Sequence, residues 1–184
     1  PPERWAKSLR FEPLSSIGRL NEPHLRWGLW LIALQCDAEE ARVFLNKLKC
    51  SNAVIRKLTA LAAWHDRVPS LKTGRDWKRA ALQSGKETAH DWLKIAEAAF
   101  ADQAAGWDRR RQLEAEGWLK EMPITGIREL AVTGHELKNL PGMSGPRIGE
   151  MLERLAEAVA LGDLPNRKDK LLEQAAQWMG ASAT

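Results

Sequence analysis

The segment 142–149, "GMSGPRIG", has the composition of a turn that binds phosphate. Three glycines and a proline stand directly before an apolar-periodic stretch, and Pro146 suits the first position of a helix. Backbone N–H groups exposed at a helix start attract phosphate, and a nearby cation adds to that attraction. We therefore expect an anion-binding turn formed by Ser144, Gly145 and Arg147, with Lys138 beside it. The alternative is that the glycines only let two helices pack closely.

The turn does not match the motifs that process phosphate or acyl groups. A Walker loop ends in Gly-Lys-Ser/Thr, whereas Gly149 is followed by Glu150. The dinucleotide-binding fingerprint requires a preceding strand and a different glycine spacing. A nucleophile elbow needs one residue more than "GMSG" supplies around Ser144. We expect this turn to bind a ligand without transforming it.

Cationic side chains gather in three parts of the chain, whose formal net charge is +4. A single charged run is usually a solvated face, but three in one basic chain favour an anionic partner. The first run has only Asp76 as an anion within it, the second is a triple arginine, and the third surrounds the glycine turn and the start of the last helix. The three runs are Arg67, Lys72, Arg75, Lys78 and Arg79; Arg109, Arg110 and Arg111; and Lys138, Arg147, Arg167, Lys168 and Lys170.

The chain has nine tryptophans and no tyrosine. An exposed indole can stack on an unpaired base, and a buried one fills a core. Trp77 lies between Asp76 and Lys78 in the first basic run, so we select it as the candidate for base stacking. Most of the others are expected in the core, among them Trp27, Trp64, Trp92 and Trp178.

The four histidines do not form a metal-binding pattern. His65 and Asp66 are adjacent, as in HD-type phosphohydrolases, but such enzymes need further His and Asp ligands on other helices. The spacing of His24, His90 and His135 does not supply them. We therefore expect no metal site and treat all four as solvated or hydrogen-bonded helix residues.

The elements that must position these residues all have a helical period. Apolar residues recur at three- and four-residue steps, and β-branched residues do not alternate over more than a few positions. Asp37 with Glu40 predicts a capping box, and Ser51 predicts another helix start. The sequence thus predicts an all-α protein with helices over 24–34, 37–48, 51–64, 76–83, 87–100, 107–120 and 146–161, and a last helix that starts at Asn166 and ends before Gly180.

A change of composition divides this helical chain. The segment 116–126, "EGWLKEMPITG", ends an apolar run, and Pro123 and Gly126 interrupt helix propagation. We predict a helical body domain over residues 1–121 and a small helical tail domain over residues 122–184.

Length and composition limit the class of protein. A chain of 184 residues with 44% hydrophobic residues is expected to fold. Two cysteines without a CxxC spacing suit a reducing compartment, so we expect a cytoplasmic protein. No apolar run is long enough to span a membrane, and the start "PPERW" lacks a Met, so we expect part of a longer protein.

Two long segments resemble the C-terminal half of bacterial CCA-adding enzymes, the tRNA nucleotidyltransferases of the class shared with bacterial poly(A) polymerases. They are "RWGLWLIALQCDAEEARVFLNKLKCSNAVIRKLTAL" and, downstream, "MPITGIRELAVTGHELKNLPGMSGPRIGEMLERLAEAVALGDLPNRKDKLLEQAAQWM". The order "ELAVTGHEL", "GPRIGEMLERLAEAV", "GDLPN" is the most specific part and corresponds to the family's tail domain. The resemblance implies a helical body and tail that bind the acceptor stem and elbow of tRNA, while separate head and neck domains carry the nucleotide chemistry.

The chain lacks the catalytic motifs of that family. It has no Asp-x-Asp pair to hold two magnesium ions and no Glu-Asp-x-x-Arg element to select the incoming nucleotide. The resemblance therefore implies that magnesium and CTP or ATP bind the parent protein's head and neck, and that this chain has no catalytic residue, no metal and no cofactor. It leaves open whether the parent adds CCA, A only, CC only or poly(A).

If tRNA is the ligand, phosphate contacts should supply most of the affinity. The predicted RNA-binding residues are Arg75, Trp77, Lys78, Arg79, Arg109, Arg110, Arg111, Lys138, Ser144, Gly145, Arg147 and Lys168.

Two other functions remain open. The glycine turn also resembles a helix-hairpin-helix, with one residue too many between its glycines, which would make the chain a DNA-binding module. The third hypothesis is a helical scaffold whose basic faces serve only solubility.

Overall fold

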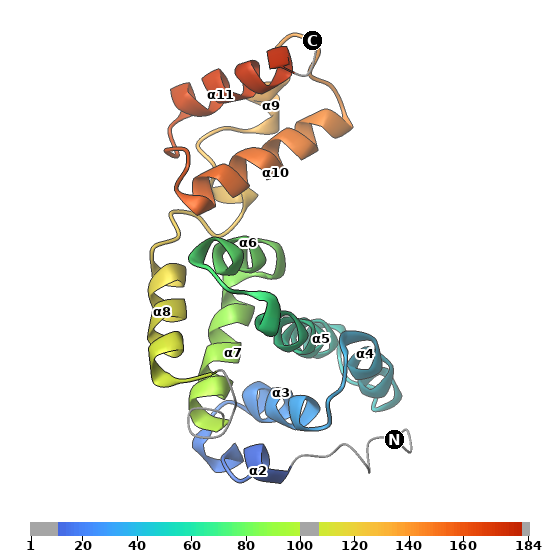
Figure 1. Ribbon diagram of the computed structural model, residues 1–184. Helices are drawn as coiled ribbons and strands as arrows, with labels where there is room; N and C mark the ends of the chain where they lie inside the picture. The colour runs from blue at the N-terminus through green and yellow to red at the C-terminus, as the bar shows by residue number, and fades with distance from the viewer. Residues whose placement is uncertain (1–10, 100–106, 182–184) are drawn as a thin grey trace.

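The computed structural model describes residues 11–99 and 107–181, and all the regular secondary structure in these ranges is helical (Figure 1). This confirms the all-α prediction. The body helices are α2 (Phe11–Leu14), α3 (Pro23–Ala33), α4 (Ala38–Lys47), α5 (Asn52–Arg67), α6 (Gly74–Ser84), α7 (Lys86–Ala99) and α8 (Arg109–Lys120), with 3-10 turns η1 (Ile17–Arg19) and η2 (Val68–Ser70). The C-terminal elements are η3 (Ile127–Glu129), α9 (Gly134–Leu137), α10 (Pro146–Leu161) and α11 (Lys168–Ala181). The predicted end of the fifth helix at Phe100 lies outside the described residues.

The helix starts follow from capping side chains. Asp37 and Glu40 form the predicted capping box, and Ser51 accepts a hydrogen bond from the N–H of Val54. A second box explains why α6 starts at Gly74, before the predicted Asp76. The Thr73 hydroxyl accepts from the N–H of Asp76 at 3.2 Å, and the Asp76 carboxylate accepts from the N–H of Thr73 at 2.8 Å.

Asn166 has a different role from the predicted one. α11 begins at Lys168, and the Asn166 side chain instead holds the segment after η3. Its Oδ1 accepts from the N–H of Ala131 and its Nδ2 donates to the carbonyl of Glu129, both at 2.8 Å. This side chain therefore connects the start of α11 to the loop that leads into α9.

The buried side chains form one main core and one smaller core. The smaller core lies among α3, α4 and α5 and includes Leu31, Leu45 and Leu58. The main core extends from Leu20 to Ala175, and therefore runs from the body helices into α10 and α11. Met122 and Ile124, next to the predicted domain boundary, are buried within it. The boundary between residues 121 and 122 stays a prediction.

Four indoles lie together in the main core and correct the hypothesis for Trp77. The Trp77 ring centroid is 5.6 Å from that of Trp64, 6.2 Å from that of Trp92 and 5.8 Å from that of Trp107. Trp77 has no exposed surface, so its indole cannot stack on a base in this conformation, and the prediction is wrong. Trp27 also differs from expectation, because 42% of it is exposed.

Figure 1 shows an elongated molecule in which α9, α10 and α11 form one end. α10 packs on α6 of the body, and α8 runs along one side of the body toward the C-terminal helices. No helix in the described ranges has both the length and the apolar character of a membrane span.

Candidate nucleic-acid interface

The predicted anion-binding turn connects α9 to α10 on the surface. Gly142 and Gly145 have φ values of +77° and +43°, in the left-handed region that favours glycine. Ser144 and Gly145 are exposed, and among the described residues nothing accepts a hydrogen bond from their backbone N–H groups. Pro146 starts α10 as predicted. The turn therefore presents two N–H donors to solvent at the N-terminus of a 16-residue helix.

Two cations beside this turn remain available. The Arg147 guanidinium is exposed, and within residues 11–99 and 107–181 it donates only to the carbonyl of Gly142, at 3.4 Å. Lys138 is exposed and has no carboxylate partner among the described residues. Arg147 therefore places positive charge on the turn, and Lys138 adds a charge at the end of α9, four residues before Gly142.

Lys168, the third predicted cation of this region, is engaged. Its ammonium pairs with Glu136, the side chain that also caps α9 by accepting from the N–H of Thr133 at 2.7 Å. The hydrogen bonds from Lys168 and then Thr133 lower the pKa of Glu136 to about 2. Lys168 therefore fixes the start of α11 to α9, which reduces its availability for an outside anion.

A mainly apolar hollow of about 850 Å³ adjoins the turn, between α10 and α11. The Arg154 guanidinium lies 4.0 Å from the centroid of the Trp178 ring, a cation–π contact that fixes both side chains at its edge. Arg147 and Arg154 face a single carboxylate, Glu150, so positive groups are in excess here.

Two residues of the first predicted basic run join α6 to the C-terminal end of the molecule (Figure 1). Arg75 forms two hydrogen bonds of 2.8 Å with the carboxylate of Asp163, and Arg79 donates to Glu157 at 2.6 Å. Lys78 lies 3.5 Å from Glu121. Because a carboxylate neutralises each of these cations, their attraction for phosphate is weaker than the sequence cluster predicts. They stay candidate RNA-binding residues, because each keeps part of its surface exposed.

The three consecutive arginines of the second run have different contacts. Arg109 pairs with Glu97 at 2.9 Å, and Arg111 donates to the carbonyl of Leu71 at 3.1 Å. The Arg110 side chain is 82% exposed and lies 4.0 Å from the carboxylate of Glu114. Arg110 and Arg111 share a small hollow with Lys72, so the structure brings parts of the first and second runs together.

The hollow between body and tail has the opposite charge balance. It has a volume of about 880 Å³ and lies beside α6, η3 and α10. Four glutamates outnumber three arginines on its walls, so it is not suited to phosphate. The four are Glu129, Glu150, Glu153 and Glu157.

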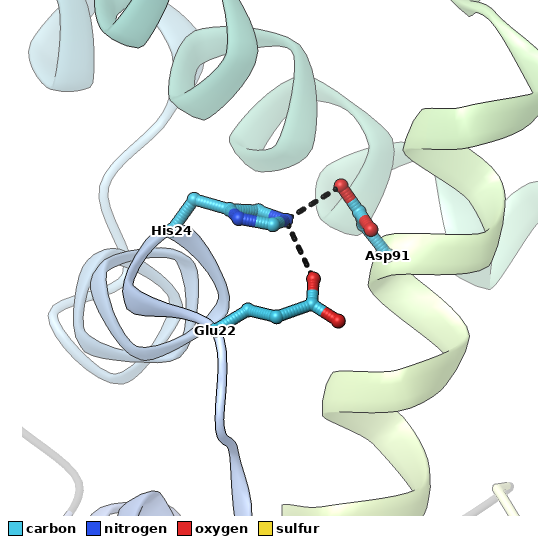
Figure 2. Close-up of side chains that lie close together, drawn as sticks. All are labelled: Glu22, His24 and Asp91. Carbon is cyan, nitrogen blue, oxygen red and sulfur yellow. Dashed lines mark hydrogen bonds and ion pairs between the residues drawn. The ribbon is translucent and has the colours of Figure 1, made fainter.

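One group of three potential metal ligands occurs in the described residues: Glu22, His24 and Asp91 (Figure 2). His24 Nε2 lies 3.0 Å from Asp91 Oδ2 and 3.4 Å from Glu22 Oε2. Two lysines already neutralise these carboxylates, with Lys57 Nζ 3.2 Å from Asp91 and Lys94 Nζ 2.9 Å from Glu22. We interpret the group as an ion network that joins α3, α5 and α7.

His65 and Asp66, the adjacent pair considered as a metal motif, lie outside that group. Nδ1 of His65 accepts a hydrogen bond from Trp92 Nε1 at 3.2 Å. Burial lowers the pKa of His65 to about 4, so the imidazole is neutral near pH 7. It serves as an acceptor inside the tryptophan core.

Sequence reasoning did not select Trp118, Arg154 or Trp178 as site residues, although all three line surface hollows. Trp118 could have been selected from helical spacing, because it follows Arg111 by seven residues and therefore lies on the same face of α8. The Arg154–Trp178 pair joins two helices and has no comparable local signal.

Comparisons with known proteins show the family of the chain. The family model for tRNA nucleotidyltransferase domain 2 matches residues 19–175. A CCA-adding enzyme of Bacillus velezensis is 27% identical over 167 residues, and one of Limosilactobacillus reuteri is 28% identical over 172 residues. These matches cover 90% and 88% of this chain, and 39% of each relative.

A solved structure has the same fold. The Bacillus stearothermophilus CCA-adding enzyme in complex with CTP superposes with a TM-score of 0.72 at 24% identity, over 98% of this chain and 42% of that one. The chain thus spans about two fifths of the length of the proteins it matches. Because the family model covers most of the 184 residues, the chain belongs to the tRNA nucleotidyltransferase domain 2 family.

Proposed function

We propose that this chain is the tRNA-binding part of a CCA-adding enzyme. It holds the acceptor stem and elbow of tRNA, while a head and neck elsewhere in the same parent protein add nucleotides to the 3′ end in the cytoplasm. The magnesium ions and the CTP or ATP of that reaction bind the head and neck. By itself the chain adds no nucleotide.

The observation that carries this proposal is the exposed turn at the start of α10. Open N–H groups of Ser144 and Gly145 precede Arg147, and Lys138 ends the helix before the turn; neither cation has a carboxylate partner in the described ranges. Such a surface suits the sugar-phosphate frame of A-form RNA, which hides its major-groove edges and presents phosphates and 2′-hydroxyls. Family membership and the CCA-adding relatives make tRNA the RNA to test.

Filter binding of the 184-residue chain to tRNA, to duplex DNA and to an unrelated RNA hairpin tests the proposal. We expect tRNA to bind more tightly than either competitor, with an affinity that falls steeply between roughly 50 and 200 mM salt. Equal or stronger binding of duplex DNA would favour a DNA-binding module instead. No binding to any of the three would favour a scaffold.

The double variant K138A/R147A tests the turn itself. Each lost phosphate contact should weaken tRNA binding and lower the slope of log affinity against log salt by about one unit. K47A/R56A removes the same charge from exposed positions on α4 and α5, far from the turn, and serves as the matched control (Figure 1). If K138A/R147A weakens tRNA binding no more than K47A/R56A does, the turn is not part of the interface.

A further inference from the structure

A small hollow on the body lies between α8 and the loop that precedes α6. Its volume is about 370 Å³, and α8 supplies most of its wall. The fold here brings together Lys72 from the first basic run and Arg110 and Arg111 from the second, which are far apart in the sequence. The lining residues are Lys72, Trp107, Asp108, Arg110, Arg111, Glu114 and Trp118.

The charges around this hollow leave two cations available. Asp108 caps α8 and accepts from the N–H of Arg111 at 2.8 Å, so its carboxylate is engaged in the helix start. Arg110 lies 4.0 Å from Glu114 and is 82% exposed. Lys72 is exposed, and no carboxylate of the described chain pairs with its ammonium. Arg75, Lys78, Arg79 and Arg109, in contrast, each lie 3.5 Å or less from a carboxylate.

Arg111 forms the fixed floor of the same hollow. Its guanidinium donates to the carbonyl of Leu71 at 3.1 Å and lies 5.2 Å from the centroid of the Trp107 ring. These contacts hold a positive charge at a set position between α8 and the 71–73 loop. A ligand would therefore meet one preorganised cation and two adjustable ones.

Trp118 supplies an aromatic surface next to these cations. Its indole packs against Gly74, where an added Cβ would lie 2.9 Å from Trp118 Cδ1. The close approach fixes the ring, while Trp118 keeps part of its surface exposed along the hollow. A fixed indole beside cations can hold a base by stacking while the cations hold the phosphate.

We propose that this hollow binds one unpaired nucleotide of an RNA strand, with its phosphate at Lys72, Arg110 and Arg111 and its base against Trp118. The inference deepens the proposed function and rests on it, because it assigns a second RNA contact to the body. It differs from the contact at the glycine turn, which has charge and N–H donors but no aromatic wall in the turn itself.

The charge arm of the test uses K72A/R110A in the full 184-residue chain. We expect tRNA binding about tenfold weaker at roughly 100 mM salt, with a shallower salt slope. K47A/R56A is the matched control because it removes two exposed charges from α4 and α5, neither of which lines the hollow. An affinity equal to that of the control overturns the phosphate assignment.

The aromatic arm compares W118F with W118L. Phenylalanine keeps a stacking face, whereas leucine fills a similar space without one, so we expect near-normal binding for W118F and at least fivefold weaker binding for W118L. Thermal unfolding checks that both variants fold. Equal affinities of the two folded variants overturn the base assignment.

The outcomes separate this inference from the proposed function. If wild type binds tRNA and K72A/R110A binds equally well, the hollow is not a site and the turn still is. If wild type does not bind tRNA, the proposed function fails first. Binding of a fully paired RNA duplex is measured as well. If K72A/R110A weakens the binding of this duplex as much as that of tRNA, the hollow does not bind an unpaired nucleotide.

Discussion

His65 connects the stability of the tryptophan core to pH. Burial lowers its pKa from 6.5 to about 4, so the folded state binds fewer protons than the unfolded state between these values. Its contribution to stability is therefore complete above about pH 6.5 and is lost as the pH falls toward 4. The shift corresponds to about 3 kcal/mol at most.

H65N tests this assignment, because an asparagine amide oxygen can accept from Trp92 but does not titrate. We expect the free energy of unfolding, measured by urea titration, to fall for wild type between about pH 6.5 and 4.5 and to change less for H65N. H135N removes an exposed histidine and should follow wild type. If the free energy of unfolding of H65N falls with pH as steeply as that of wild type, groups other than His65 cause the pH dependence.

At the scale of elements, Gly28 of α3 sets how closely that helix approaches α5 and α7. An added Cβ would collide with Leu61 and lie 3.0 Å from Ile95 Cδ1. We expect G28A to lower the free energy of unfolding by about 1 to 3 kcal/mol, the usual cost of overpacking. The measurement is urea unfolding followed by circular dichroism.

Gly117 of α8 provides the matched control, since a Cβ there meets nothing within 4 Å. Alanine favours a helix interior over glycine, so G117A should stabilise by about 0.5 to 1 kcal/mol. If G28A and G117A change the free energy of unfolding equally, α3 does not pack closely on α5 and α7.

The helices were predictable because their starts and apolar stripes are local. Asp37, Ser51 and Pro146 begin helices as expected. The one-turn helix α9 is too short to show a period, and Asn166 binds backbone 35 and 37 residues away, which no local pattern encodes. The burial of Trp77 could have been predicted, because Ala80 and Ala81 follow it at three- and four-residue steps and continue a buried stripe.

The candidate site was less predictable because partners distant in sequence decide which cations are available. Arg75 and Arg79 meet carboxylates 88 and 78 residues downstream. The sequence around these two arginines contains few anions, but the fold brings carboxylates to them that neutralise their charge. The exposed turn with Arg147 matches the expectation, because its glycines and Pro146 act locally.

At the scale of the whole molecule, the continuous core predicts a single unfolding unit. Buried side chains run without interruption from α3 to α11, and Arg75 and Arg79 join α6 to the C-terminal end. We expect one cooperative transition in urea, with helix content and tryptophan fluorescence changing together. Two separate transitions would show that the body and tail unfold independently.

We propose that the whole chain holds tRNA at the surface of the α9–α10 turn. Hydrogen–deuterium exchange of the 184-residue chain, with and without tRNA, tests it most directly because the proposed donors are backbone N–H groups. We expect bound tRNA to slow exchange over residues 142–149, and we expect none of this protection in K138A/R147A at the same tRNA concentration. Bound tRNA that leaves exchange over 142–149 unchanged would contradict it.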